Sequence, residues 1–200
     1  MEVIDLVNIP ELHLMLGYVN LVFDELNERS KALLSQGLID KSAYRWGHQK
    51  GIVPEDYWGN KMNGPNCDKL LHHAKQLTDF LPHDLKKFGI ALERFQDFKM
   101  ACFTQDLKPD WPERLELLKE AFDKLGVRMT PKIHCLFQHV PEFLTRHPDH
   151  GLGFYSEQPF EAVHSAFNKT WPNYKRNMDS PDYPEKFKAA VVAFNSSNIG

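Results

Sequence analysis

The sequence predicts an all-α protein, an irregular bundle of about seven or eight helices. Apolar residues recur three and four positions apart through most of the 200 residues, which is the period of helices that bury one face. Proline or glycine stands at the ends of several of these segments, as expected where helices begin and stop. No segment of any length reads as a convincing strand. We therefore expect a single helical domain over residues 1–200.

The longest helix is expected over residues 9–36. Pro10 suits its first turn and Gly37 its end, with apolar residues at helical spacing between them. A weaker helix is expected over residues 39–46. The next stretch, GHQKGIVPEDYWGNKMNGPN, is rich in glycine, proline and asparagine, and we expect an ordered loop there.

Several further helices are expected, each from its own start or stop signal. Residues 66–80 end before Pro82, and residues 83–105 carry three phenylalanines expected in the core. The remaining helices are predicted over residues 110–125, 130–146 (bent near Pro141), 156 to about 170 or 174, and 184–194.

Composition limits the classes of function. The net charge of −3 and the pI of about 6.4 argue against a non-specific nucleic-acid binder, which usually has a clear basic excess. No apolar run reaches the length of a membrane span, and the N-terminus lacks the layout of a signal peptide. The three cysteines are far apart and odd in number. These features predict an intracellular protein without a membrane partner.

The segment after Ser156 concentrates groups that can bind metal. Glu157, Glu161 and His164 are spaced by four and three residues, so they share one face of the expected helix. Charged faces of this kind are usually just solvated, and Glu157 also suits the first turn through the helix dipole. The sharper interpretation is that Glu157 or Glu161 binds a divalent cation, because Mg²⁺ and Mn²⁺ prefer oxygen ligands.

Two other groups of side chains have both a functional and a structural interpretation. His134 and His139 lie five residues apart on one expected helix, a spacing also found between the histidines of zinc fingers. In the functional interpretation the two histidines are metal ligands, and in the structural interpretation they are ordinary core or surface histidines. The basic residues Lys169, Lys175 and Arg176 form a strip that contacts phosphate, or part of a mixed solvated surface.

The residues from 134 to 161 also carry motifs of a known family. They read His134-x4-His139-Val140-Pro141-Glu142, then Gly151-Leu152-Gly153, then Tyr155-Ser156-Glu157 with Glu161 behind. This block resembles the C-terminal catalytic region of RNase H-fold DDE transposases, above all the branch of Transib-type transposases and the V(D)J recombinase catalytic subunit. The chain also resembles uncharacterised transposon-borne proteins that share PELH, YWG, TPK-x-H and YSEQ-x2-E-x-VH.

The resemblance implies roles for particular residues. His134 and His139 would belong to a structural zinc site, and Glu157 or Glu161 would complete a triad of catalytic acids. The second acid would fall where this chain has Pro10-Glu11, which makes Glu11 the candidate there. The chain departs from the family in having no strand for the first acid and no counterpart of the zinc-binding cysteine pair.

On this resemblance, the chain is the helical C-terminal portion of a transposase. Residues 1–127 would correspond to its helical insertion, and residues 128–200 to the part with the acid and the histidine pair. Mg²⁺ or Mn²⁺ held by the acids would serve DNA cleavage and strand transfer, with zinc as a second metal.

The expected partners are DNA and either the rest of the catalytic core or a second copy, in the nucleus of a eukaryote. We expect no activity from the chain alone. The alternatives are a non-catalytic helical interaction module and a small helical metalloprotein.

Overall fold

The structure is a computed structural model that describes residues 10–55, 59–156, 167, 169–175 and 179–198. These residues form helices and turns, and their β-structure is limited to one isolated bridge between Glu55 and Lys61. The prediction of an all-α protein is confirmed. The chain divides into two compact units, residues 1–156 and 157–200, which are described separately. This division does not coincide with the one drawn from the resemblance after residue 127.

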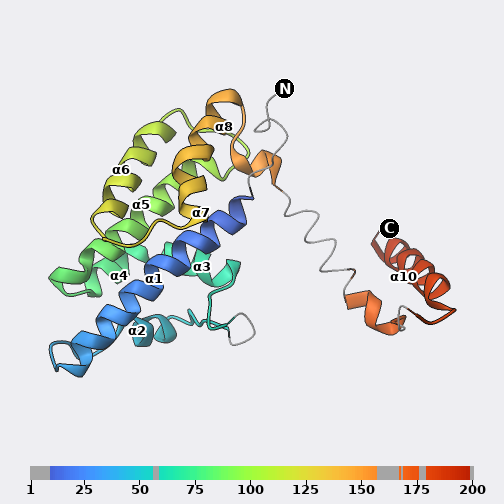
Figure 1. Cartoon of the computed structure of the whole chain (residues 1–200), viewed down its shortest axis with the longest axis horizontal. Helices are drawn as coiled ribbons and strands as arrows, with labels where there is room; N and C mark the ends of the chain where they lie inside the picture. Colours follow the sequence, from blue (N-terminus) through green and yellow to red (C-terminus); the bar gives the residue numbers. More distant parts are fainter. Residues whose placement is uncertain (1–9, 56–58, 157–166, 168, 176–178, 199–200) are drawn as a thin grey trace. The chain divides into compact units, whose positions relative to one another are not determined.

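Helix α1 (Glu11–Ser35) runs through the middle of the first unit, with α2 and α3 along one side and α5 and α6 along the other (Figure 1). Its inner face is fully buried at Tyr18, Val19, Val22 and Leu26. The helix ends as predicted at Gly37, which has φ +71°. The N–H groups of Gly37 and Leu38 donate to the carbonyls of Leu34 and Leu33, so the last carbonyls of the helix are satisfied.

The short helices α2 to α4 follow with individual caps. Helix α2 covers Ala43–Gln49, where Ser42 accepts a hydrogen bond from the Arg45 N–H. The predicted helix over 66–80 is instead two helices, α3 (Gly64–His72) and α4 (Ala74–Phe80). The chain leaves helical geometry at His73, with φ −101° and ψ 9°, and apolar residues on both sides of the break are buried. Helical periodicity alone did not reveal this break.

Helices α5 (Lys86–Cys102) and α6 (Trp111–Asp123) pack along each other. The phenylalanines at 88, 95 and 98 are completely buried, which confirms their predicted place in the core. Phe95 stacks on Tyr18 of α1 with ring centroids 4.4 Å apart. Ile90 and Met100 of α5 belong to the same apolar pattern but are 43% and 46% exposed.

The predicted helix over 130–146 is interrupted by a wider turn. It consists of α7 (Pro131–His134), a π-helical segment (Cys135–His139) and α8 (Val140–Arg146). Pro141 has no N–H to donate to the carbonyl four residues earlier, which weakens the α-helical ladder at this point. The Val140 N–H donates to the Cys135 carbonyl, five residues back. The bend predicted near Pro141 therefore takes the form of a π turn.

The second unit contains a short 3₁₀ turn (Trp171–Asn173) and α10 (Tyr183–Asn198). Helix α10 includes the predicted helix over 184–194 and is longer at both ends. Aromatic rings hold the unit together: Trp171 lies 5.6 Å from Phe187 between centroids, and Phe167 lies 5.7 Å from Phe194. Among the described helices of both units, none combines the length and apolar character that crossing a membrane requires.

Candidate functional site

The two histidines predicted to bind metal are neighbours on the surface of the first unit. His134 ends α7 and His139 ends the π-helical segment, and their ring centroids lie 5.3 Å apart. In a regular α-helix, positions five apart point about 140° away from each other. The wider π turn reduces this angle and brings the two exposed imidazoles together.

The surroundings of the pair decide whether it is a zinc site. A carboxylate lies beside the pair: Oε2 of Glu142 is 3.8 Å from Nδ1 of His139, but its Oε1 accepts a hydrogen bond from Arg146. Burial raises the pKa of the Cys135 thiol, which disfavours the thiolate that zinc requires. The described residues contain no group of three or more His, Cys, Asp or Glu placed to hold a metal. The histidines therefore do not form a complete zinc site with their described neighbours.

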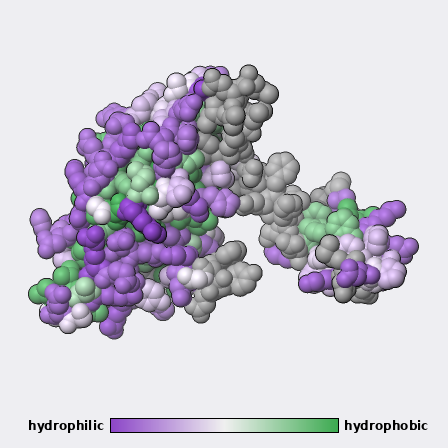
Figure 2. Space-filling view, in the orientation of Figure 1, coloured by the Kyte–Doolittle hydropathy of each residue, from purple (hydrophilic) through white to green (hydrophobic). Residues whose placement is uncertain are grey.

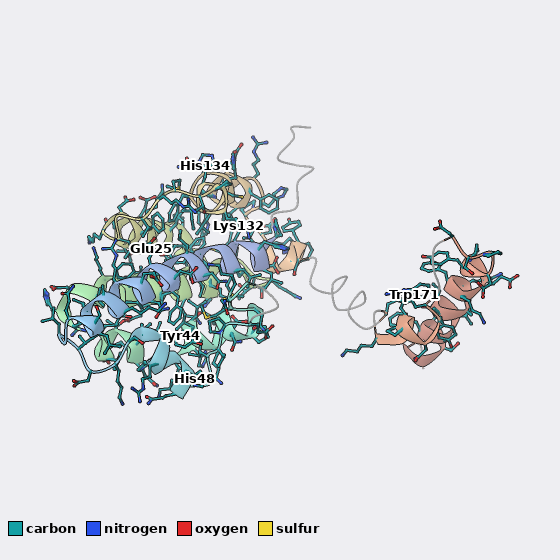
Figure 3. The ribbon with its side chains drawn as sticks, turned by 60° about the horizontal axis from the view of Figure 1, so that its bottom comes forward. Glu25, Tyr44, His48, Lys132, His134 and Trp171 are labelled. Carbon is teal, nitrogen blue, oxygen red and sulfur yellow. The ribbon has the colours of Figure 1, made fainter. Side chains whose placement is uncertain are left out.

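Helix α7 lies close to α1 because Gly17 has no side chain. A Cβ atom at Gly17 would lie 2.5 Å from Cδ and 2.9 Å from Cβ of Lys132, well inside van der Waals contact. In Figure 3, Lys132 lies along α1, while His134 is at the outer side of the same short helix. The missing side chain at Gly17 thus allows the segment that carries the histidine pair to pack closely against α1.

The glycine-rich turn after α8, which contains Gly151 and Gly153, packs closely against a neighbouring loop. Gly151 and Gly153 lie against the loop that leaves α5, and their N–H groups donate to the carbonyls of Gln105 and Thr104 at 2.8 and 3.2 Å. A Cβ at Gly151 would lie 2.3 Å from the Thr104 carbonyl oxygen, and one at Gly153 would lie 2.7 Å from that of Phe103. Only glycine allows this backbone-to-backbone contact, which places the start of the Ser156 segment.

Ser156, at the C-terminal end of the first unit, contacts Glu11, the candidate acid near the N-terminal end. Its hydroxyl donates a hydrogen bond to Oε1 of Glu11, across 145 residues of chain. Glu11 occupies the first turn of α1, where the helix dipole favours a carboxylate, and it is only 5% exposed. The structure therefore brings together two of the segments that the sequence singled out separately.

Sequence reasoning missed a cluster of rings beside this contact. His150 stacks on Phe154 with ring centroids 3.8 Å apart. His147 lies 4.6 Å from Phe143 and 5.4 Å from Tyr155. The spacing of four residues within the pairs 143/147 and 150/154 was the available signal. The rings join α8 to the turn that leads to Ser156.

The remaining predicted site residues belong to the second unit. Glu157, Glu161, His164 and Arg176 lie outside the described residues, so their roles stay predictions. Lys169 and Lys175 are described, and both are exposed. Their predicted contact with DNA also stays a prediction.

Comparisons of the chain with protein-family models, with curated proteins and with solved structures found no match.

Proposed function

We propose that this chain is the C-terminal helical portion of a DDE transposase- or recombinase-like protein. It contributes a metal-binding carboxylate and DNA contacts to strand cleavage and transfer, and it needs the rest of a catalytic core or a second copy for activity. The contact between Glu11 and Ser156 carries this proposal. It joins Glu11 to Ser156, the residue before Glu157, and on the resemblance Glu11 and Glu157 are candidates for the family's second and third acids.

The chain's own residues have distinct parts in this proposal. Glu11 is buried and accepts a hydrogen bond from the Ser156 hydroxyl, so it fixes the last residue of the first unit, directly before Glu157 in the sequence. Glu157 or Glu161 then presents a carboxylate to Mg²⁺ or Mn²⁺. The bound metal would supply activation of water or a 3′ hydroxyl and stabilisation of the leaving oxygen. Because Glu11 is nearly inaccessible to solvent, we assign it a positioning role rather than the role of a metal ligand.

Lys169 and Lys175, with Arg176, are the proposed DNA contacts. The two described lysines are exposed, as phosphate contacts must be. The net charge of −3 gives the chain as a whole no general attraction for DNA. Binding would therefore be local, and lysine-to-glutamine changes at 169 and 175 should weaken it at every DNA sequence tested.

The test is Mn²⁺ binding followed by water-proton relaxation, with Glu157→Gln and Glu161→Gln beside the wild type. Glu28→Gln is the matched control, since Glu28 is an exposed carboxylate of α1 that pairs only locally with Lys31. We expect one of the two variants to lose Mn²⁺ binding at least tenfold, and the control to keep it. Equal binding by all four proteins would refute the metal-binding role.

Zinc is tested separately by metal content after purification. Stoichiometric zinc that disappears in both His134→Ala and His139→Ala would require ligands beyond the two neighbouring imidazoles. Such a result would favour the segment after Ser156 as the source of these additional zinc ligands. A protein free of zinc after exposure to the metal would exclude a stable structural site at this pair.

A second candidate function is a helical protein-interaction module. The observation in its favour is the surface of α10, where Phe187 is 45% and Val192 57% exposed. Figure 2 shows hydrophobic side chains gathered on the second unit. This function predicts that Val192→Ser abolishes binding to a partner while the Mn²⁺ experiment shows no dependence on either carboxylate.

A further inference from the structure

Helices α5 and α6 leave a groove along their outer seam, in the first unit and away from the proposed acids in sequence. Its floor is apolar and consists of Ile90 from α5 with Leu117 and Ala121 from α6. The volume is about 150 Å³, equivalent to about five water molecules, which is room for one apolar side chain. In Figure 2, hydrophobic residues interrupt the hydrophilic surface where these helices lie.

Ile90 is the residue that makes this floor unusual. Its neighbours Gly89, Ala91 and Leu92 are buried, whereas Ile90 itself is 43% exposed on the outer side of α5. An isolated exposed aliphatic side chain is common on protein surfaces. Here it lies in a hollow between two helices and is framed by charges, which is the arrangement of an anchor pocket.

The rim of the groove is mainly positive. Lys87, Arg94 and Lys124 line it together with one carboxylate, Glu120. The ammonium of Lys124 has no hydrogen-bond or ion-pair partner among the described residues, and Lys87 donates to the Lys124 carbonyl at 3.1 Å. Arg94 lies 3.5 Å from Asp97, which offsets part of its charge. The lining side chains nevertheless carry three positive charges against one negative charge.

Spacing along α5 defines what would fit. Lys87 and Arg94 are seven residues apart, so they lie about 10 Å apart along the helix axis with Ile90 between them. We propose that this groove docks an acidic peptide segment of a partner protein, with one apolar anchor over Ile90 between two carboxylates about 10 Å apart. In a helical partner, such carboxylates are seven positions apart with the anchor midway.

The chemistry favours a peptide over nucleic acid. Phosphates use the positive rim of the groove but gain nothing from its aliphatic floor. An acidic peptide uses both features, because its anchor buries the exposed face of Ile90 while its carboxylates meet the lysines and Arg94. The inference does not depend on the proposed function, since it uses none of the candidate acids or histidines.

The test is a titration of the ¹⁵N-labelled protein with a helical alanine-based peptide of about fifteen residues, with two glutamates seven positions apart and a leucine midway. One small anchor predicts weak binding, with a Kd of about 10⁻⁴ to 10⁻³ M at low salt. We expect saturable shifts of the amide signals around Ile90, Leu117 and Ala121. They should weaken when salt is raised, and they should vanish when the glutamates are replaced by glutamines.

Matched variants separate docking from general surface effects. Ile90→Ser should weaken peptide binding at least fivefold, whereas Met100→Ser should not, although Met100 is on the same helix and is 46% exposed. Lys124→Glu should weaken binding, whereas Lys41→Glu, an equal charge change outside the groove, should leave it unchanged. Shifts that are absent, that lie elsewhere, or that do not depend on Ile90 would overturn the proposal. So would a short duplex DNA that produces the same shifts more strongly than the peptide.

Discussion

Replacing Gly151 by alanine tests the packing that places the candidate site. Gly151 has φ −79° and ψ 173°, an extended conformation that alanine adopts without strain. The new methyl group would nevertheless lie 2.3 Å from the Thr104 carbonyl oxygen and 2.7 Å from that of Cys102. These are backbone atoms and cannot rotate away, so the turn must shift as a whole.

The expected loss of stability follows from these contacts. Overpacking a well-packed site costs about 1–3 kcal/mol, and two backbone clashes place Gly151→Ala at the upper end, about 3 kcal/mol. The shift also strains the hydrogen bond from the Gly151 N–H to the Gln105 carbonyl, now 2.8 Å long. With a urea m-value of about 2 kcal/mol per molar, the midpoint of unfolding should fall by about 1.5 M.

The control separates the two physical uses of glycine in this chain. Gly126 has φ +67° and no atom within 4 Å of an added Cβ, so Gly126→Ala should cost only the backbone strain of about 1 kcal/mol. Gly126→Asn should cost less, because asparagine tolerates this conformation. Urea unfolding followed by circular dichroism measures all three. A smaller loss for Gly151→Ala than for Gly126→Ala would refute the packing of the turn against the loop after α5.

Two further predictions concern the core of the first unit. Gly17→Ala should lower the free energy of unfolding by about 1–3 kcal/mol through its clash with Lys132. Adding Lys132→Ala to this variant should restore part of the lost free energy. Purely additive effects in the double variant would contradict the contact. Burial raises the pKa of Cys67 to about 12 and that of Tyr18 above its usual range. The unfolded thiol and phenol lose protons near pH 8.5 and 10, so stability should fall as the pH rises from about 9 towards 12. A urea midpoint independent of pH over this window would contradict the burial of both groups, and Cys67→Ala should show a smaller fall.

Local signals in the sequence predicted the helices well where one face of each helix is buried. The stop at Gly37 and the buried phenylalanines of α5 depend on near neighbours or on helical spacing, so the sequence contains them directly. The break at His73 and the exposure of Ile90 do not follow from spacing. They depend on which faces the neighbouring helices cover, which is a property of packing.

The sequence by itself determined an all-α fold, the identity of the histidine pair and the glycine-rich turn. Only the tertiary structure decided that His134 faces His139 across a π turn, that the glycines serve backbone packing, and that Ser156 binds Glu11. The reason is physical. A side chain's type and local spacing are written in the chain, but contacts between residues 145 positions apart exist only after the helices between them have packed.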